Sequence, residues 1–511
     1  MNLDFDLERF IREKVTRRER SLLAEDFARY DAELHARIDG RRVLVIGGAG
    51  SIGSHYIKAL LRFDVAKLVV VDISENGLTE LVRDLRSAGT YRMPREFVTY
   101  PVNFGDRVFA KLFAAHGPFD IVANFAAHKH VRSEKDIFSI EAMIENNVLR
   151  ARGLLDLLEQ APPQHFFCVS TDKAANPVNI MGASKKLMEE LILAYADVLP
   201  IKTARFANVA FSNGSLPQGW LERLAKRQPW SCPLGIRRFF VSPIESGELC
   251  LMASIMGESG DIVFPKLDEA RDMIPFDQVA RDLLAALGME ADGCRSEEEA
   301  LLRPRSGRNG ECKNMRGAGE DERGACDRDL ARGEPGDGGV LTQRRGDAET
   351  QGFYPHLCDH SVVAKSGCNG ECKTGRGAGE DARGASDGGL ARGEPGDGSV
   401  LTQRRGGAET QGFYPHARWP VYFFESDTSG EKPYEEFYTP GEALDLERFV
   451  NLGVVKNAPR RSLAEIDGIF ASLQRLFASA DVTKADVVHA LKDYLPNFEH
   501  IETGKSLDQK M

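Results

Sequence analysis

The chain has 511 residues, which at roughly 150 residues per domain is enough for about three domains. Its formal net charge of −11 at pH 7 argues against a surface built to bind nucleic acid, so we expect no nucleic-acid partner. With 42% hydrophobic and 28% charged residues, the composition is that of a folded globular protein and excludes a chain that is disordered throughout.

The cysteines and the apolar runs indicate the compartment. Nine cysteines at irregular spacing give no disulfide framework, so we expect a reducing compartment and a cytoplasmic location. Cys368 and Cys372 lack a matching second pair, and we predict no metal site. Asp4, Asp6 and Glu8 interrupt the first apolar residues, so we expect no signal peptide. Apolar runs nowhere reach the roughly 18 to 20 residues of a membrane span, and we expect none.

The first 302 residues divide into a helical segment and a large α/β domain. In residues 1–39, apolar residues from Phe10 to Ile38 recur at helical spacing and predict two amphipathic helices that pack on the following domain. In residues 40–302, short β-branched runs alternate with helical patterns, which predicts a doubly wound parallel sheet of the Rossmann type. The runs are VLVIGG, KLVVVDIS, EFVTYPV, DIVANFAA, HFFCVSTD and IKTARFANVAF.

Residues 303–417 differ in kind from the rest. Residues 309–356 and 369–416 repeat with an offset of 60, and only eight of 48 aligned positions differ. Gly, Arg, Glu and Asp dominate both copies, which have almost no apolar face to bury against each other. We therefore predict a disordered, duplicated insert; a two-repeat binding module is the alternative. Residues 418–511 resume globular composition and are predicted to pack back on the core.

A glycine-rich turn predicts a dinucleotide site. Gly47, Gly50 and Gly53 lie between an apolar strand and an amphipathic helix, which Ser51 and Ile52 open. Such a turn lets a pyrophosphate approach the backbone N–H groups of the helix. Asp72 ends the next strand, where a carboxylate can bind the adenosine ribose and repel a 2′-phosphate, so NAD is favoured over NADP. The alternatives are tight helix packing for the glycines and a helix cap for Asp72.

Several further motifs carry a resemblance to a known family. They are GGAGSIG, NFAAHKHV, ENNVLRARGLL, STDKAANPVN, MGASKK, RFANVAFSNGS and IRRFF, within about residues 42–288. The chain resembles the extended short-chain dehydrogenase/reductases, and more narrowly the CapD-like UDP-N-acetylglucosamine 4,6-dehydratases of polysaccharide biosynthesis. The resemblance implies an NAD cofactor, a nucleotide-sugar substrate and a homo-oligomer, for which the N-terminal helices are a candidate interface.

The resemblance also implies a reaction. Such enzymes oxidise the sugar at C4, eliminate water across C5 and C6, and return the hydride to C6. Asp172 would be the acid and Lys173 the base, adjacent at the carboxyl end of a strand, where a doubly wound sheet places its ligands. A solvated surface pair is the alternative for these two residues.

The chain departs from the family at Met181. The family at large has Tyr-x-x-x-Lys, in which the lysine holds the nicotinamide ribose and the phenolate takes the C4 hydroxyl proton; here the motif runs from Met181 to Lys185. Because a thioether cannot act as a base, the candidates to relay that proton are Thr171, Asp172 and Lys185. The alternative is that Met181 fills a core gap in an enzyme that has lost catalysis.

The resemblance assigns further positions to the site. His128 and His130 could be ligands, although hydrogen-bonded structure is the commoner role for such a pair. A nucleotide-sugar 4-epimerase or reductase is the second functional hypothesis, but it needs the missing tyrosine; a non-catalytic NAD-binding protein is the third. The cofactor positions are Asn103, Ala126, Ala127, Lys129, Asn147 and Ser170, and the substrate positions are Asn208, Ser212, Asn213 and Arg238.

Overall fold

The computed structural model describes residues 5–130, 134–303, 417–425, 436–456 and 458–502. Every described residue belongs to one compact unit. Of the predicted insert, Arg303 caps the last helix before it and Ala417 begins the strand after it. The rest of the predicted insert lies outside the described residues.

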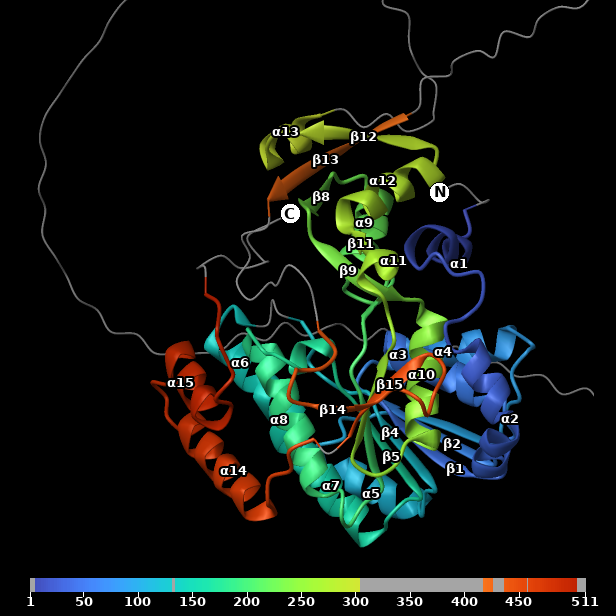
Figure 1. The fold of residues 1–511 in the computed structure, drawn as a ribbon, viewed down its shortest axis with the longest axis vertical. Coiled ribbons are helices and arrows are strands. Elements are labelled where there is room, and N and C mark those ends of the chain that lie inside the picture. The colour runs from blue at the N-terminus through green and yellow to red at the C-terminus, as the bar shows by residue number, and fades with distance from the viewer. Residues whose placement is uncertain (1–4, 131–133, 304–416, 426–435, 457, 503–511) are drawn as a thin grey trace, which may run out of the picture. The chain divides into compact units, whose positions relative to one another are not determined.

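A nine-stranded sheet is the centre of the described unit, and it confirms the predicted doubly wound class (Figure 1). Seven neighbouring strands run parallel, and two strands from the C-terminal part of the chain add antiparallel to one edge. The order is β14 (Ala443–Asp445), β15 (Leu452–Lys456), β10 (Asp261–Pro265), β6 (Ile201–Ala204), β5 (His165–Val169), β4 (Ile121–Asn124), β1 (Arg42–Ile46), β2 (Lys67–Asp72) and β3 (Glu96–Pro101).

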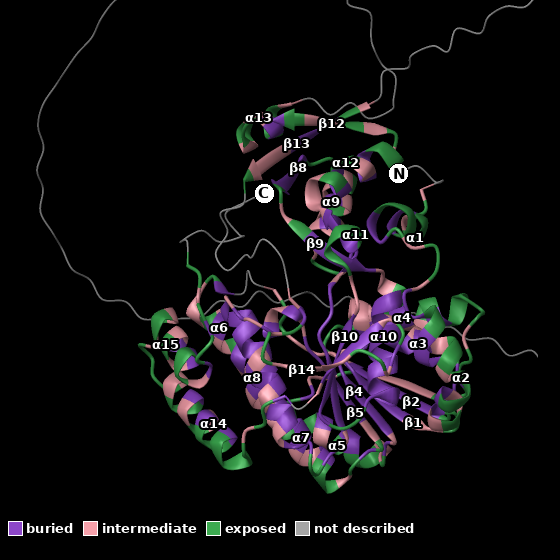
Figure 2. Ribbon diagram, viewed as in Figure 1, coloured by how far each residue is buried: buried purple, intermediate pink, exposed green. Residues whose placement is uncertain are grey.

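The central strands read as continuous apolar runs because helices cover both faces of the sheet. In β1 and β2 almost every residue is buried, as Figure 2 shows for the middle of the sheet. Strand β1 pairs with β2 on one side and β4 on the other, so the chain order reverses there and leaves a crevice at the carboxyl ends. The flanking helices include α3 (Ser51–Leu60), α4 (Glu75–Ser87), α5 (Arg107–His116), α7 (Arg150–Gln160), α8 (Ile180–Ala194) and α10 (Pro243–Met256).

A smaller sheet carries a second hydrophobic core, separate from the main core around the large sheet. Its strand order is β12 (Met289–Cys294), β13 (Ala417–Glu425), β8 (Trp230–Leu234), and both pairings are parallel. The rings of Trp220 and Trp230 stack at 5.5 Å in this second core. The helices that pack there are α9 (Leu216–Ala225), α12 (Phe276–Ala286) and α13 (Glu297–Leu302).

A third sheet, which we call the middle sheet, lies between the two cores. It consists of β11 (Met273–Pro275), β9 (Arg237–Val241) and β7 (Asn208–Val209), and the short helix α11 (Glu269–Asp272) leads into it. Successive side chains of a strand point to opposite faces. Accordingly, Phe239 and Val241 belong to the main core, whereas Phe240 belongs to the second.

The N-terminal arm, residues 5–38, packs on both cores. It contains α1 (Leu7–Phe10), the π-helical turn η1 (Ile11–Val15) and α2 (Ala24–Ile38). Phe10 and Ile11 are buried in the second core, and Leu34 and Ile38 in the main core. The apolar residues of the arm are therefore used within this chain.

Two C-terminal helices pack on the helix that carries Met181 and Lys185. Helices α14 (Leu463–Phe477) and α15 (Lys484–Tyr494) share a buried cluster with α6 (Ile137–Ile144), η3 (Glu145–Leu149) and α8. Leu473 and Leu491 are fully buried there, alongside Met181 and Leu187 of α8.

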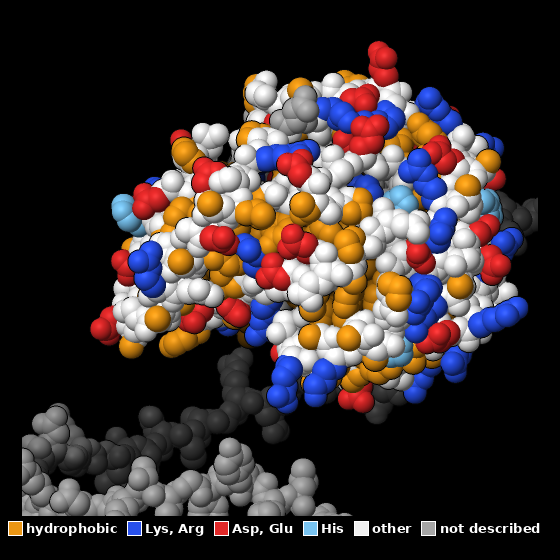
Figure 3. Space-filling view, turned by 90° about the horizontal axis from the view of Figure 1, so that it is seen from below, with side chains coloured by type: hydrophobic (Ala, Val, Ile, Leu, Met, Phe, Trp, Pro, Cys, Tyr) orange, Lys and Arg blue, Asp and Glu red, His pale blue; other side chains and the backbone are white. Residues whose placement is uncertain are grey.

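The outer surface mixes both signs of charge. On the face drawn in Figure 3, basic and acidic side chains are interspersed with apolar ones. Among the described residues, no helix combines the length and the apolar character that crossing a membrane requires.

We predict that Leu473→Ala lowers the free energy of unfolding by roughly 2–5 kcal/mol, because it opens a cavity between α14 and α8. Leu463→Ala on the same helix is the control; that side chain is 36% exposed and should change stability by less than about 0.5 kcal/mol. Urea denaturation monitored by circular dichroism measures both. Equal effects of the two substitutions would show that α14 does not pack as described.

Candidate active site

Two neighbouring cavities open at the carboxyl ends of the central strands. The first is bordered by the ends of β1, β2 and β3, and the second by those of β4, β5 and β7 together with α8. Phe125 and Ala127, just after β4, line both cavities. This is the crevice in which doubly wound sheets bind their ligands.

The glycine turn, residues 47–53, borders the first cavity and requires its glycines. Gly47 has a φ of +75°, and a Cβ there would lie 2.5 Å from the backbone N of Ala126. A Cβ at Gly53 would collide with the carbonyl oxygen of Gly47, so this glycine lets helix and strand pack closely. The missing side chains of this turn therefore let α3 pack closely on the strand and leave the backbone accessible to a ligand.

The N-terminus of α3 is open to the first cavity. Its N-cap is Gly50, which supplies no side-chain hydrogen bond, whereas α4 is capped by Ser74 and α8 by Asn179. The first N–H groups of a helix seek an acceptor, and an anion such as a pyrophosphate suits them. Ser51 does not line either cavity; its Oγ accepts a hydrogen bond from the Asn213 N at 2.8 Å.

Asp72 lies in the first cavity and is held by the backbone. Its carboxylate accepts hydrogen bonds from the Ala49 N at 3.0 Å and the Ser74 N at 2.9 Å. The helix-cap alternative for Asp72 is wrong, because the cap of α4 is Ser74. Asn103 also lines this cavity, with its Oδ1 accepting from the Gly105 N.

Thr171, Asp172 and Lys173 form the polar corner of the second cavity, directly after β5. The Thr171 hydroxyl donates to Asp172 Oδ1 at 2.7 Å, and Lys173 Nζ lies 3.2 Å from the same oxygen. The Asp172 side chain is 3% exposed and that of Lys173 is 22% exposed, so the surface-pair alternative does not describe them. The side chains expected to act as acid and base are therefore in contact inside the crevice.

A buried ion pair lies next to this corner and is hydrogen-bonded to Ser170, the residue before Thr171. Arg205 and Glu189 are fully buried and joined by two hydrogen bonds of 2.9 and 2.8 Å. Burial by itself would raise the pKa of Glu189, but the charge and hydrogen bonds of Arg205 outweigh it, and the pKa lies below its ordinary value. Glu189 also accepts a 2.6 Å hydrogen bond from Ser170, and Arg205 reaches Glu442 from the C-terminal part.

Helix α8 brings Met181 and Lys185 to the second cavity, as their four-residue spacing predicts. Two side chains accept hydrogen bonds from the first N–H groups of this helix. Asn179 Oδ1 accepts from the Gly182 N, and Glu134 Oε1 accepts from the Met181 N at 2.9 Å. Lys185 Nζ donates to the Val169 carbonyl at 2.8 Å. Burial lowers the pKa of Lys185.

Asn147 supports the crevice without lining it. Its side chain donates to the His128 carbonyl at 2.9 Å and accepts from the His128 N at 2.8 Å, so it fixes the backbone after β4. Ser184 of α8 accepts a further bond from it. His128 lines the first cavity and His130 the second, and burial lowers the pKa of His128.

The predicted substrate residues divide into two groups. Asn208, Ser212 and Asn213 line the second cavity. Arg238 of β9 is buried and is not among the residues that line it; its Nη1 donates to the Arg237 carbonyl.

The structure brings most of the predicted residues to the two cavities and adds some that the sequence did not suggest. Ile73, Phe104 and Phe125 each follow the end of a parallel strand, and this position is the signal by which they could have been found. Within the residues that the structure describes, His, Cys, Asp and Glu side chains form no group of three suited to a metal ion. The first cavity holds Gly47, Gly50, Asp72, Asn103, Ala126 and Ala127, and the second holds Ile52, Ala127, Lys129, Ser170, Thr171, Asp172, Lys173, Met181, Lys185, Asn208, Ser212 and Asn213.

The strand order, the glycine turn and the corner after β5 define a Rossmann-type protein of the extended short-chain dehydrogenase/reductase class. The family model described as "Polysaccharide biosynthesis protein" matches residues 43–312. The chain belongs to this polysaccharide biosynthesis protein family.

Three relatives illustrate the similarity. An uncharacterized membrane protein of Methanocaldococcus jannaschii is 32% identical over 49% of this chain and 74% of its own length. The probable polysaccharide biosynthesis protein EpsC of Bacillus subtilis is 28% identical over 45% of this chain, which spans only 38% of that protein. The inverting UDP-N-acetylglucosamine 4,6-dehydratase of Campylobacter jejuni is 27% identical over 44% of this chain and 67% of its own length.

We predict that Glu189→Gln lowers the free energy of unfolding by roughly 3–5 kcal/mol, because it leaves the buried charge of Arg205 without its main partner. The control is Glu13→Gln, which breaks the exposed Arg9–Glu13 pair and should change stability by less than about 1 kcal/mol. Thermal and urea unfolding measure both variants. A loss no greater in Glu189→Gln than in Glu13→Gln would contradict the burial of this pair.

Proposed function

We propose that this chain is a nucleotide-sugar 4,6-dehydratase that uses NAD and converts UDP-N-acetylglucosamine to the UDP-4-keto-6-deoxy-hexosamine for surface polysaccharide synthesis. The observation that carries the proposal is the contact among Thr171, Asp172 and Lys173 beside Lys185 in the second cavity. The dehydratase of Campylobacter jejuni supports it as a relative with this activity in its name.

The residues of the first cavity fit a dinucleotide. The uncapped N-terminus of α3 and the close approach at Gly47 suit a pyrophosphate, and Asp72 suits a ribose with free hydroxyls. The Asp72 carboxylate would repel a 2′-phosphate, which favours NAD over NADP. When bound, NAD would accept hydride from C4 of the sugar and return it to C6.

The hydrogen bond from Thr171 to Asp172 supplies a route for the C4 hydroxyl proton without a tyrosine. Thr171 Oγ takes this proton while passing its own to Asp172 Oδ1, 2.7 Å away. Asp172 thereby becomes the protonated acid that the next step needs. Of the three candidates for this relay, Thr171 is the one already hydrogen-bonded to the acid.

Elimination then uses the two neighbours in opposite roles. Lys173, as a neutral amine, takes the proton from C5, and Asp172 gives its proton to the departing C6 hydroxyl, which leaves as water. Lys129 and Lys185 line the same cavity as Lys173. Burial also lowers the pKa of both Lys129 and Lys185. Lys173 finally returns a proton to C5, and every side chain regains its starting state.

The competing hypotheses explain less of this site. A 4-epimerase or reductase requires only hydride transfer at C4, leaving the contact between Asp172 and Lys173 without a purpose. A non-catalytic NAD-binding protein would not need Lys185 directed at the second cavity. Met181 is buried but lines the cavity, so filling a core gap is not its only role.

The purified protein with NAD should convert UDP-N-acetylglucosamine to a product lighter by one water, with deuterium at C5 in heavy water and no net NADH. Lys173→Ala should lower turnover by about 10²–10⁴-fold, because no base remains for C5, while NAD still binds. Lys226→Ala, at an exposed position at the end of α9, should retain full activity. Mass spectrometry measures the product. NADH formed in proportion to consumed substrate would refute the dehydratase assignment.

Thr171→Val should slow the oxidation at C4 by about 10²-fold or more, because the proton relay to Asp172 is cut. Thr171→Ser keeps the hydroxyl and is expected to restore most of the rate. The transient near-ultraviolet absorbance of reduced nicotinamide in a single turnover reports this step directly. An unchanged rate in Thr171→Val would assign the relay to Asp172 or Lys185 instead.

A further inference from the structure

The N-terminal arm lies across both hydrophobic cores and meets the middle sheet between them. Its first part buries Phe10, Ile11 and Val15 in the second core, and its last part buries Leu34 and Ile38 in the main core. Arg18 lies between these parts, at the level of β9.

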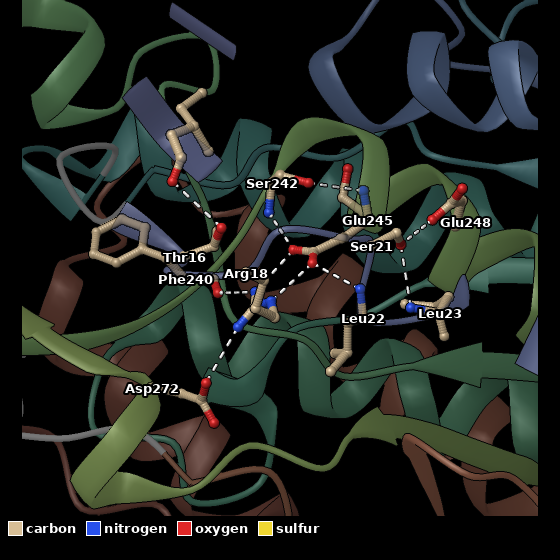
Figure 4. Close-up of polar contacts among 12 residues, drawn as sticks. Thr16, Arg18, Ser21, Leu22, Leu23, Phe240, Ser242, Glu245, Glu248 and Asp272 are labelled. Carbon is tan, nitrogen blue, oxygen red and sulfur yellow. Dashed lines mark hydrogen bonds and ion pairs between the residues drawn. The ribbon is translucent and has the colours of Figure 1, made fainter. Parts of the chain in front are cut away.

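Arg18 is the polar centre of this crossing (Figure 4). Its Nε and Nη2 each donate a 2.8 Å hydrogen bond to the Glu245 carboxylate, in the bidentate geometry that an arginine favours. Nη2 also donates to the Phe240 carbonyl at 3.0 Å, and Nη1 lies 3.3 Å from Asp272. The side chains of Glu245 and Asp272 are each only 2% exposed; Arg18 is the cation that pairs with Glu245, whereas Asp272 also pairs with Arg271 at 3.0 Å.

Glu245 connects Arg18 to the cofactor side of the site. It lies in the first turn of α10, where it also completes the capping box with Ser242. Helix α10 packs against α3 so closely that a Cβ at Gly247 would collide with the backbone of His55. Since α3 begins at the glycine turn, Glu245 and the N-terminus of α3 belong to one rigid pair of helices.

Phe240 and Asp272 connect Arg18 to the substrate side. Phe240 of β9 is paired in register with Asn208 of β7, which lines the second cavity. Asp272 directly precedes β11, which pairs with the other edge of β9. One guanidinium therefore holds α10 on one side and the strand beside Asn208 on the other.

We propose that the N-terminal arm is a brace that sets the separation of the two walls of the second cavity, with Arg18 as its positioning residue. The walls are the first turn of α3, which contributes Ile52, and the segment of residues 208–215. Within the site they are joined by the hydrogen bond from the Asn213 N to Ser51 Oγ, whose length depends on the same separation. The choice of UDP-N-acetylglucosamine as the substrate rests on the proposed function, whereas the brace itself does not.

Three full-length variants test the brace. Arg18→Met removes every polar contact, and Arg18→Lys keeps the charge but not the bidentate geometry. Arg9→Met, on the same arm, loses only the exposed pair with Glu13 and serves as the control. If Arg18→Met does not fold, Arg18→Lys carries the test.

Hydrogen exchange measures the brace directly, without catalysis. In Arg18→Met, amides of residues 206–215 and 237–241 should exchange about tenfold faster, while β1, β2 and β4 keep their protection. Arg18→Lys should fall between this variant and the wild type, and Arg9→Met should match the wild type. Faster exchange spread evenly over the large sheet would indicate general destabilisation and overturn the proposal, as would unchanged exchange at β7 and β9.

Binding and kinetics supply the second readout. The NAD dissociation constant in Arg18→Lys should stay within about twofold of the wild type, while KM for UDP-N-acetylglucosamine rises about fivefold and kcat changes less. A fall in kcat at constant KM would overturn the positioning role. If the wild type does not turn over this substrate, the proposed function fails, while the exchange pattern still decides the brace.

Discussion

The polar corner formed by Thr171, Asp172 and Lys173 depends on one buried ion pair, that of Arg205 and Glu189. Two opposite charges without access to water are tolerated only when each is fully hydrogen-bonded, and removal of either leaves the other uncompensated. The pair joins the end of β6 to the middle of α8, and through Ser170 it fixes the backbone just before Thr171. Through Glu442 it also holds the C-terminal part of the chain. The placement of Thr171, Asp172 and Lys173 therefore follows from an interaction outside both cavities.

The sequence was sufficient for strands β1 to β6 of the large sheet, because strands buried on both faces are continuous apolar runs such as VLVIGG and KLVVVDIS, but not for β10 or the antiparallel edge strands β14 and β15. The glycine turn and the Asp172–Lys173 pair could also be found from the sequence, because the residues of each are close together in the chain. The partners of Arg18 could not, because Glu245 is 227 residues away and no periodicity relates them. The place of Arg238 in the middle sheet could not be found either, because β9 pairs with β7 and β11, which are distant in the chain.

The middle sheet connects the two hydrophobic cores to the second cavity. Its strands are too short to give a sequence signal, yet they bury side chains in both cores and carry Asn208 to the second cavity. The cavity residues that follow β4 and β5 belong to the large sheet, whereas Asn208 belongs to this thin layer. Because the layer is only three strands wide, Arg18, which contacts its middle strand β9, is one strand away from Asn208 of β7.

Strand β13 sets the order in which the molecule can be completed. It lies between β12 and β8, although residues 304–416 separate it from β12 in the chain. During synthesis, the edges of β8 and β12 that pair with β13 stay unpaired until residues 417–425 have left the ribosome. Until then Trp230 of β8 lacks its neighbouring strand. Open strand edges invite pairing with other chains. The nascent protein thus has a prolonged interval in which a chaperone would be of use, long after strands β1 to β6 have been translated.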